Sequence, residues 1–225
     1  MLASVDNASF AVGKVLSLAD PSRIDGTFDA VCCGGTAWRC GAGLFDGPVW
    51  SEPRPVQIPP FTAIAVRRED YLSVGGLDEA FVSYLEDVDF GLRSASKGYT
   101  GRYVPEAVAW HAGSATLGRW HPETVRLLSR NQVFLVARHY SRNMLWRYGW
   151  KIAVAQLLWG GIAFRRGRGL AWMKGKWDGI RGCREMRSLP DPGVDLLLQR
   201  SEEEMKTLQA ETGQELYWRL YFALT

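Results

Sequence analysis

The stretch GGLDEAFVSYLEDVDFGLRSASKGYTGRYVPEAVAWH, Gly75–His111, decides how this chain folds. Its glycine pair predicts a turn, and Ser83 and Glu86 have the S-x-x-E spacing of a helix capping box. We therefore expect a helix whose first turn carries acidic residues and which ends at Gly98. Short extended segments follow, so that His111 is expected at the end of a strand. An acidic helix start and a histidine at a strand end can converge on one cleft, which is the layout of an active site.

The charged residues of this helix fall into two groups. Asp87 and Asp89 form a D-x-D pattern, but residues two apart on a helix do not share a face, so their carboxylates diverge. Asp89 precedes Arg93 by four residues, the spacing of a structural helical ion pair. Asp87 precedes Gly91 by four residues, and the missing side chain there is expected to leave room for a ligand. Glu86 and Asp87 also have a simpler interpretation, compensation of the helix dipole, and the residues alone leave both interpretations open.

The same stretch resembles the acceptor half of inverting family-2 glycosyltransferases, closest to their bacterial rhamnosyltransferase-like branch. The resemblance rests on G-G-L-D-E-A-F…Y-L-E-D-V-D-F-G-L-R…G-Y followed by V-P-E-A-V…H-A-G-S-A-T, and it extends from about Asp25 to the C-terminus. The E-D-x-D block with its downstream histidine is its most specific part. It implies an α/β chain with a partial GT-A (nucleotide-diphospho-sugar transferase) fold that lacks most of the N-terminal nucleotide-binding half and is followed by C-terminal helices.

The resemblance also implies the roles of three residues. Asp87 would be the general base that deprotonates the acceptor hydroxyl, and Glu86 would help to hold the acceptor. His111 would ligate Mn²⁺ or Mg²⁺ bound to the diphosphate of the sugar donor. The implied partners are a nucleotide-diphosphate sugar, with rhamnose as one candidate, and a glycan or lipid-linked acceptor of bacterial cell-wall or polysaccharide biosynthesis. A base and a cation that neutralises a departing diphosphate are what an inverting displacement requires.

Length and composition limit the alternatives. With 225 residues, of which 47% are hydrophobic, the chain can bury a substantial core. Its net charge of +3 is too small to indicate a nucleic-acid partner. The four cysteines lack the paired spacing of a zinc site, and residues 1–10 show no signal peptide, so we expect reduced thiols and a cytoplasmic chain.

Three parts are expected along the chain: residues 1–140 as the C-terminal half of a GT-A-like catalytic domain, residues 141–189 as a basic helical membrane-interface segment, and residues 190–225 as a helical tail. Within the first part we expect loops at 20–29 and 34–60, the second long enough to be a lid or substrate loop. The ordered elements expected there are a strand or short amphipathic segment at 10–18, a buried strand at 61–67, a short helix at 68–74 and a helix at 122–140. In the tail, residues 201–204 repeat the capping-box spacing.

The basic segment between residues 141 and 189 contains a short apolar run, Lys151–Phe164, flanked by arginines and tryptophans. A run of about fourteen residues is too short to span a bilayer, which needs about twenty. Apolar length, basic flanks and tryptophans suit a segment that lies in the membrane interface, and this predicts a peripheral protein on the inner face of the cytoplasmic membrane. A helix packed on the catalytic core is the alternative.

Three functional hypotheses follow. The first is the acceptor and base portion of a glycosyltransferase, a fragment or split form expected to be inactive without a nucleotide-binding half, because the D-x-D of that half has no counterpart here. The second is a non-catalytic membrane-surface module derived from such an enzyme. The third is a metal-dependent hydrolase that uses Glu86, Asp87 and His111, which we disfavour because one histidine and one acid make a poor metal site.

Overall fold

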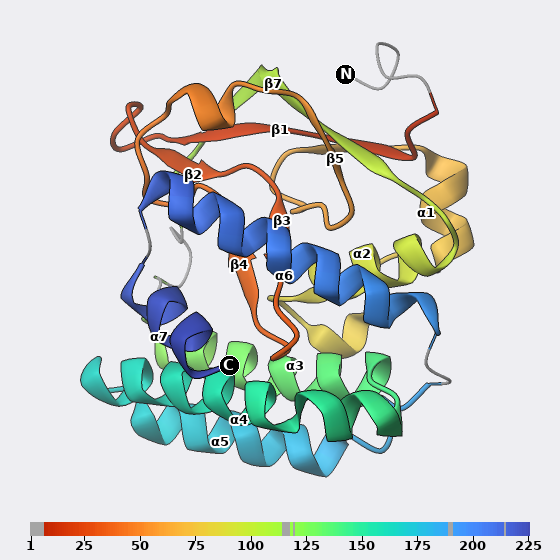
Figure 1. The fold of residues 1–225 in the computed structure, drawn as a ribbon, viewed down its shortest axis with the longest axis vertical. Helices are drawn as coiled ribbons and strands as arrows, with labels where there is room; N and C mark the ends of the chain where they lie inside the picture. Colours follow the sequence, from red (N-terminus) through yellow and green to blue (C-terminus); the bar gives the residue numbers. More distant parts are fainter. Residues whose placement is uncertain (1–6, 114–117, 119, 189–190, 214) are drawn as a thin grey trace. The chain divides into compact units, whose positions relative to one another are not determined.

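The computed structural model describes residues 7–113, 118, 120–188, 191–213 and 215–225. It is a mixed α/β protein, in agreement with the α/β class expected from the sequence (Figure 1). The chain forms two compact units. The first comprises Met1–Ala30, Trp38–Asp78 and Glu86–Ala115, and the second comprises Val31–Ala37, Glu79–Leu85 and Thr116–Thr225.

The first unit is built on a sheet whose central pair is β1 (Phe10–Ser17) and β7 (Gly101–His111), which run parallel. Strands β2 (Ile24–Gly26) and β6 (Ile64–Val66) pair antiparallel with β1, and β5 (Arg54–Val56) pairs antiparallel with β7. The register of the central pair shifts where Gly13 is opposite Val104 and Lys14 is opposite Val108. A Cβ atom on Gly13 would lie 2.3 Å from the Ala107 carbonyl oxygen, so a glycine is needed beside this bulge.

Three sequence-based expectations for this unit need correction. The expected loop at 20–29 contains β2 and the first residue of β3 (Asp29–Val31), which pairs with β4 (Ala37–Arg39). The expected loop at 34–60 contains β4, β5 and the 3₁₀ helix η2 (Pro48–Trp50). The expected buried strand is the half-buried β6. Glycine, proline and aspartate are uncommon in strands, so their presence in these stretches predicted loops although strands of three residues form there.

Helices α1 (Arg68–Val74) and α2 (Glu86–Ser96) complete the first unit. Gly98 follows α2 with a φ of 77°, the left-handed conformation expected of a helix-terminating glycine. The Asp89 carboxylate is fully buried and pairs with Arg93 at 2.8 Å. Arg93 also donates to the carbonyls of Val74 and Gly76, which ties α2 to the end of α1.

The expected capping box at the start of α2 is wrong. Glu86 is the first helical residue, whereas a capping box would place it at the third helical position. Tyr84 and Leu85 have positive φ angles of 70° and 68°, so the chain enters the helix through a left-handed turn. The carbonyl of Ser83 accepts a hydrogen bond from Asn131.

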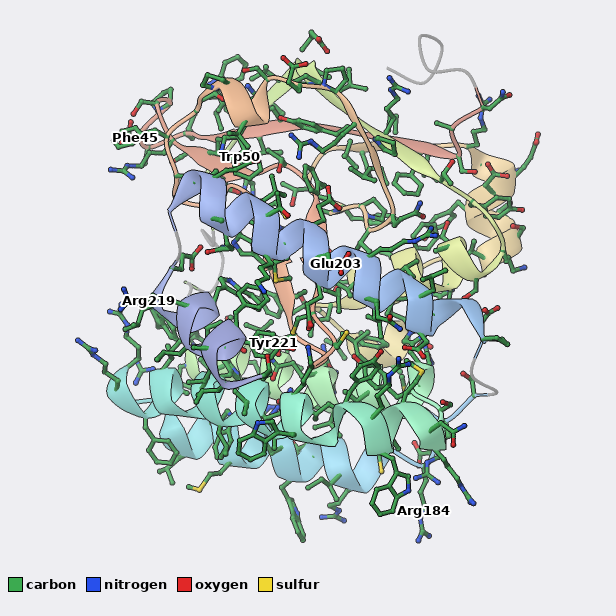
Figure 2. The ribbon with its side chains drawn as sticks, viewed as in Figure 1. Phe45, Trp50, Arg184, Glu203, Arg219 and Tyr221 are labelled. Carbon is green, nitrogen blue, oxygen red and sulfur yellow. The ribbon has the colours of Figure 1, made fainter. Side chains whose placement is uncertain are left out.

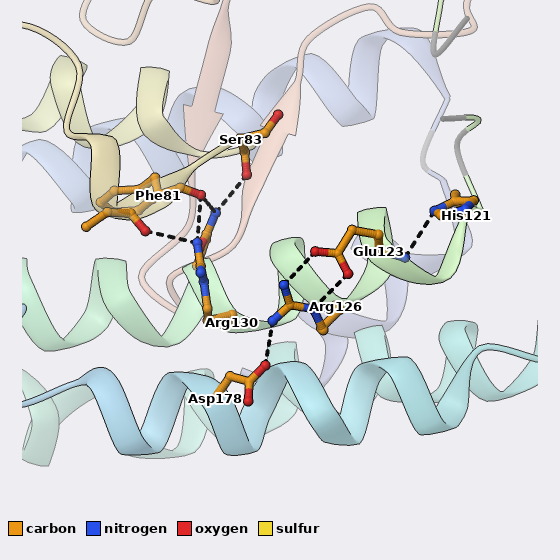
Figure 3. Close-up of polar contacts among 9 residues, drawn as sticks. Phe81, Ser83, His121, Glu123, Arg126, Arg130 and Asp178 are labelled. Carbon is orange, nitrogen blue, oxygen red and sulfur yellow. Dashed lines mark hydrogen bonds and ion pairs between the residues drawn. The ribbon is translucent and has the colours of Figure 1, made fainter. Parts of the chain in front are cut away.

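The second unit is helical. Its elements are η3 (Glu79–Phe81), α3 (Pro122–His139), α4 (Arg142–Arg165), α5 (Gly169–Gly182), α6 (Gly193–Thr212) and α7 (Leu216–Leu224). His121 caps α3, because its Nδ1 accepts from the Glu123 amide at 3.2 Å (Figure 3). Helix α5 packs closely against α3, since a Cβ on Gly175 would lie 2.2 Å from the Arg126 carbonyl oxygen. Arg126 also pairs with Asp178 across these two helices (Figure 3).

Residues 79–85, which precede α2 in the chain, are held by α3. The Asn131 side chain donates to the carbonyls of Phe81, Ser83 and Tyr84. Arg130 donates to the carbonyls of Ala80 and Phe81 (Figure 3). This loop therefore gains its conformation from side chains of α3.

The C-terminal helices pack on residues 31–37. Ser201 Oγ accepts from the Val31 amide, and Glu202 accepts from the Cys33 amide at 2.7 Å and from the Tyr221 hydroxyl at 2.7 Å. Tyr221, labelled in Figure 2, accepts in turn from the Gly34 amide at 3.0 Å. The second expected capping box is therefore wrong, because Ser201 lies in the middle of α6 and its hydroxyl binds another segment.

A candidate acid–base site in the first unit

The first unit gathers four carboxylates, one arginine and one histidine from five short elements. Strand β2 provides Asp25, β3 provides Asp29 and β4 provides Arg39, while α2 provides Glu86 and Asp87 and β7 provides His111. Asp87 was predicted as a general base, Glu86 as an acceptor contact and His111 as a metal ligand. The structure adds Asp25, Asp29 and Arg39 to them.

Arg39 connects two buried carboxylates. Its Nε donates to Asp29 Oδ1 and its Nη2 donates to Asp87 Oδ2, each at 3.2 Å. Its Nη1 donates to Thr62 Oγ1, also at 3.2 Å. Asp29 raises the pKa of the Arg39 guanidinium, against the effect of its burial, and Asp87 adds to the rise. Arg39 is therefore a fixed cation beside Asp87.

Asp87 is a buried carboxylate that can gain and lose a proton near neutral pH. Burial, the largest cause, and the charges of Asp29 and Glu86 together raise its pKa from 3.8 to about 7, against the opposing effect of Arg39. Its Oδ1 accepts from the Val88 amide at 2.9 Å. A pKa close to the working pH is the property required of a general base.

Glu86 has a carboxylate oxygen with no visible partner. Its Oε2 is buried, and no hydrogen-bond donor reaches it from the described part of the chain. Burial raises the pKa of this carboxyl group, and Asp29 contributes in the same direction. Because buried polar atoms are nearly always hydrogen-bonded, the unpaired oxygen next to Asp87 in sequence indicates a place for a ligand donor.

His111 ends β7, as expected, and is oriented by Asp25. Its Nδ1 lies 2.8 Å from Asp25 Oδ2, and the imidazole side chain is 43% exposed. A histidine held by a carboxylate through one ring nitrogen can use its other nitrogen, Nε2, as a metal ligand. Among the residues that the structure describes, no three His, Cys, Asp or Glu side chains are grouped so that they could hold a metal ion. Residues Ser114–Thr116 of the H-A-G-S-A-T motif lie outside the described residues.

The expectation that Gly91 leaves room for a ligand beside Asp87 is wrong. A Cβ atom on Gly91 would lie 2.8 Å from Ile58 Cα and 3.1 Å from the Gln57 carbonyl oxygen. The absent side chain therefore allows the backbone of residues 57–58 to pack against α2. The candidate ligand position is better marked by the unpaired Glu86 oxygen.

Sequence reasoning missed the residues that surround Asp87. Asp25 and Asp29 were assigned to a loop, and Arg39 lies in a glycine-rich stretch without recognisable periodicity. The available signal was the pattern I-D-G-T-F-D at residues 24–29, in which two acidic residues flank Gly26, Thr27 and Phe28. A buried acidic residue requires a cationic partner, but Arg23 is nearer in the sequence than Arg39, so this pattern alone does not identify Arg39.

Part of the chain is similar to known proteins. No protein-family model matches the chain. Over 113 residues, 50% of its length, it is 32% identical to the N-acetylglucosaminyl-diphospho-decaprenol L-rhamnosyltransferase of Mycobacterium tuberculosis, with the same values in strains CDC 1551 / Oshkosh and ATCC 25618 / H37Rv. The match spans 34% of the length of these relatives. This distant, partial homology supports a glycosyltransferase-like relationship.

Replacing Asp87 tests its titration in the folded chain. Asp87 binds its proton more tightly in the folded than in the unfolded chain, so its contribution to stability is present below its unfolded pKa and is lost as the pH rises through about 7. Relative to the parent, Asp87→Asn should therefore become more stable by about 1–2 kcal/mol as the pH rises from about 5 to about 8. Urea unfolding at several pH values measures the difference. Glu106→Gln, at an exposed position of β7, is the control, and a difference for Asp87→Asn that does not change with pH would contradict the assignment.

Proposed function

We propose that this chain provides the acceptor-binding and general-base part of an inverting, family-2-like glycosyltransferase with a GT-A fold. The observation that carries the proposal is the Asp87 carboxylate, which is buried, paired with Arg39 and raised in pKa to about 7. The partial homology to a rhamnosyltransferase supports the reaction class. A non-catalytic module would have no need of a buried carboxylate with this pKa, because such a group lowers stability at neutral pH.

The proposed reaction is a single displacement. Asp87 accepts the proton of an acceptor hydroxyl, and the hydroxyl oxygen forms a bond to the anomeric carbon of the donor sugar. The bond from that carbon to the diphosphate breaks on the opposite face, the electron pair leaves with the nucleoside diphosphate, and the configuration inverts. Glu86 Oε2 accepts a hydrogen bond from another acceptor hydroxyl, which satisfies its unpaired oxygen and orients the acceptor.

The substrates are proposed from the relative. Its name describes transfer of L-rhamnose to N-acetylglucosaminyl-diphospho-decaprenol. For this chain we propose a nucleotide-diphosphate sugar, with rhamnose as the first candidate, and a lipid-linked glycosyl diphosphate. The match covers 34% of the relative, so we also propose that the matched part corresponds to its C-terminal portion and that transfer requires a nucleotide-binding half.

His111 is proposed to bind a divalent cation, Mn²⁺ or Mg²⁺, together with the donor diphosphate. The Asp25–His111 pair fits such a role, because a carboxylate on one ring nitrogen directs the other toward a metal. The cation would supply positive charge to the departing diphosphate. One protein ligand makes a weak site, so binding should depend on the donor.

A second proposal concerns the inner face of the cytoplasmic membrane. Within the described ranges, no helix is both long enough and apolar enough to cross a bilayer. Helix α5 nevertheless exposes four apolar side chains at helical spacing: Leu170, Met173, Trp177 and Ile180, the first of them 80% exposed. Trp146 and Trp150 of α4 are also exposed, at 90% and 65%. Single exposed apolar residues are common, but a helical stripe of them suits a membrane interface.

The basic residues of this segment divide into two groups. Arg147, Lys151 and Lys176 are engaged inside the second unit: Arg147 pairs with Asp195, Lys151 pairs with Glu202, and Lys176 donates to the Ser129 carbonyl. Arg168 is half-buried and donates to the Trp120 carbonyl, and the remaining cations are exposed: Arg142, Arg165, Arg166, Lys174, Arg181, Arg184 and Arg187 (Arg184 in Figure 2). Each cation near an anionic leaflet contributes about 1 kcal/mol, so this smaller group still supports docking.

The base assignment is tested by Asp87→Asn, measured with the chain and the nucleotide-binding half that completes it. The substitution keeps size and hydrogen bonding but removes basicity, so the transfer rate should fall at least about a hundredfold. Asp89→Asn is the matched control two residues away. It removes the charged partner of Arg93, so it should lower the melting temperature and leave the rate per folded molecule within a few-fold. A rate for Asp87→Asn within a few-fold of the parent would refute the assignment.

The metal assignment is tested by Mn²⁺ binding to the same complex, followed by electron paramagnetic resonance. With donor present, we expect His111→Ala to weaken Mn²⁺ affinity by about tenfold or more, as loss of a metal-site partner does. His139→Ala is the control, because His139 is a buried residue of α3 in the second unit. Equal Mn²⁺ affinity for His111→Ala and the parent would rule out His111 as a ligand.

Membrane docking is tested by sedimentation with liposomes. We expect binding to anionic vesicles at low salt, weaker binding to neutral vesicles, and release at high salt, since the Debye length falls to about 3 Å at 1 M. Leu170→Glu combined with Trp177→Glu should abolish binding. Leu18→Glu, at an exposed apolar position of the first unit, should not. Protein that stays in the supernatant with anionic vesicles at low salt would show that docking does not occur.

A further inference from the structure

Arg39 has a backbone position fixed by its neighbours. The Thr27 amide and hydroxyl both donate to the Cys40 carbonyl, at 3.1 and 2.9 Å. The Cys40 amide donates to the Phe28 carbonyl at 2.8 Å. Thr27 and Phe28 are buried residues of the segment between Asp25 and Asp29. The segment that provides two of the acidic residues of the site therefore also fixes the residue that follows Arg39.

The aliphatic part of the Arg39 side chain lies against Gly26. A Cβ atom on Gly26 would lie 2.5 Å from Arg39 Cδ and 2.8 Å from Arg39 Cγ. Any larger residue at this position would therefore displace the arginine. Gly26 has no positive φ, so this close approach is the reason that a glycine is required here.

The guanidinium is held on three of its nitrogens. Asp29, Asp87 and Thr62 each accept one hydrogen bond from a different nitrogen. The rigid fork of an arginine can bridge two carboxylates in a fixed geometry, which the single ammonium of a lysine cannot do. Arg39 and the Val88 amide bind different oxygens of Asp87, so the direction of that carboxylate is determined by two donors.

We propose that Arg39 is a positioning residue for Asp87, seated on Gly26 and anchored by Asp29, so that one side chain fixes the direction of the base. The inference rests on the proposed function, in which Asp87 is the base. It adds three residues to the machinery of the site, none of which contacts the reacting atoms in the proposed reaction.

Three charged residues act on Asp87, and they do not all act in the same direction. Asp29 from β3 and Glu86 from α2 raise its pKa, whereas Arg39 from β4 lowers it. Asp25 from β2 acts on Arg39. Removing the arginine and removing its anchor should therefore move the Asp87 titration in opposite directions. These shifts report how the two charges act on Asp87, and the effect of Arg39→Lys on kcat against KM reports whether the arginine positions it.

The test is the titration midpoint of the Asp87 carboxyl carbon, followed by NMR in the full chain without donor or acceptor. Arg39→Gln should raise the midpoint by about one pH unit or more, and Asp29→Asn should lower it by a similar amount. Gly26→Ala keeps every charge but displaces Arg39, so it should raise the midpoint as Arg39→Gln does. Arg102→Gln is the matched control, because it removes one cation from an exposed position of β7 and should leave the midpoint unchanged.

The outcomes separate this inference from the proposed function. Opposite shifts of the Asp87 titration midpoint in Arg39→Gln and Asp29→Asn support the positioning role even if no transfer activity is found. In that case the proposed reaction would be wrong, but the contacts of Arg39 with Asp29 and Asp87 would stand. Shifts in the same direction, or no shift in either variant, overturn the inference whatever the activity. If Arg39→Gln does not fold, Gly26→Ala provides the expected rise of the Asp87 midpoint and Asp29→Asn the expected fall. With the complete enzyme, Arg39→Lys should lower kcat more than it changes KM, because it keeps the cation but not the bridge.

Discussion

Two buried aspartates, Asp29 and Asp87, share one guanidinium, and the candidate site depends on this interaction. A buried carboxylate without a partner is strongly unfavourable, so each aspartate must have a cation nearby. Arg39 serves both. Burial, and then the negative charge of Asp29, raise the pKa of Asp87, and Arg39 limits that rise. The result is a carboxylate that titrates near neutral pH, which neither a fully exposed aspartate nor a simple ion pair would do.

The need to give each buried aspartate a charged partner explains why several short elements meet at the site. Residues 24–29, IDGTFD, contribute Asp25 to His111, Gly26 to the stem of Arg39 and Asp29 to its guanidinium. Strands of three residues are sufficient because each is fixed by side-chain contacts as well as by backbone pairing. In the second unit, the side chains of Arg130 and Asn131 fix residues 79–85, which lead along the chain into α2.

Much of this fold could be predicted from local patterns, while the surroundings of the base could not. Helices α1 and α3 and the glycine that follows α2 agree with the sequence, because apolar periodicity and helix-ending glycines are local signals. The Asp89–Arg93 pair likewise follows from a spacing of four. Arg39 is 48 residues from Asp87, and no local rule links them. The capping-box patterns at Ser83 and Ser201 failed because long-range partners, Asn131 and the Val31 amide, determine those segments.

The most direct test of the account is the pH dependence of the initial transfer rate at low acceptor concentration, measured with the complete enzyme. A base must be deprotonated to act, so kcat/KM should rise with pH and level off with a midpoint near the Asp87 pKa of about 7. The residual activity of Asp87→Asn should lack this rise. A rate that is constant from about pH 5.5 to about pH 8.5, or the same rise in Asp87→Asn, would contradict the claim that Asp87 is the base.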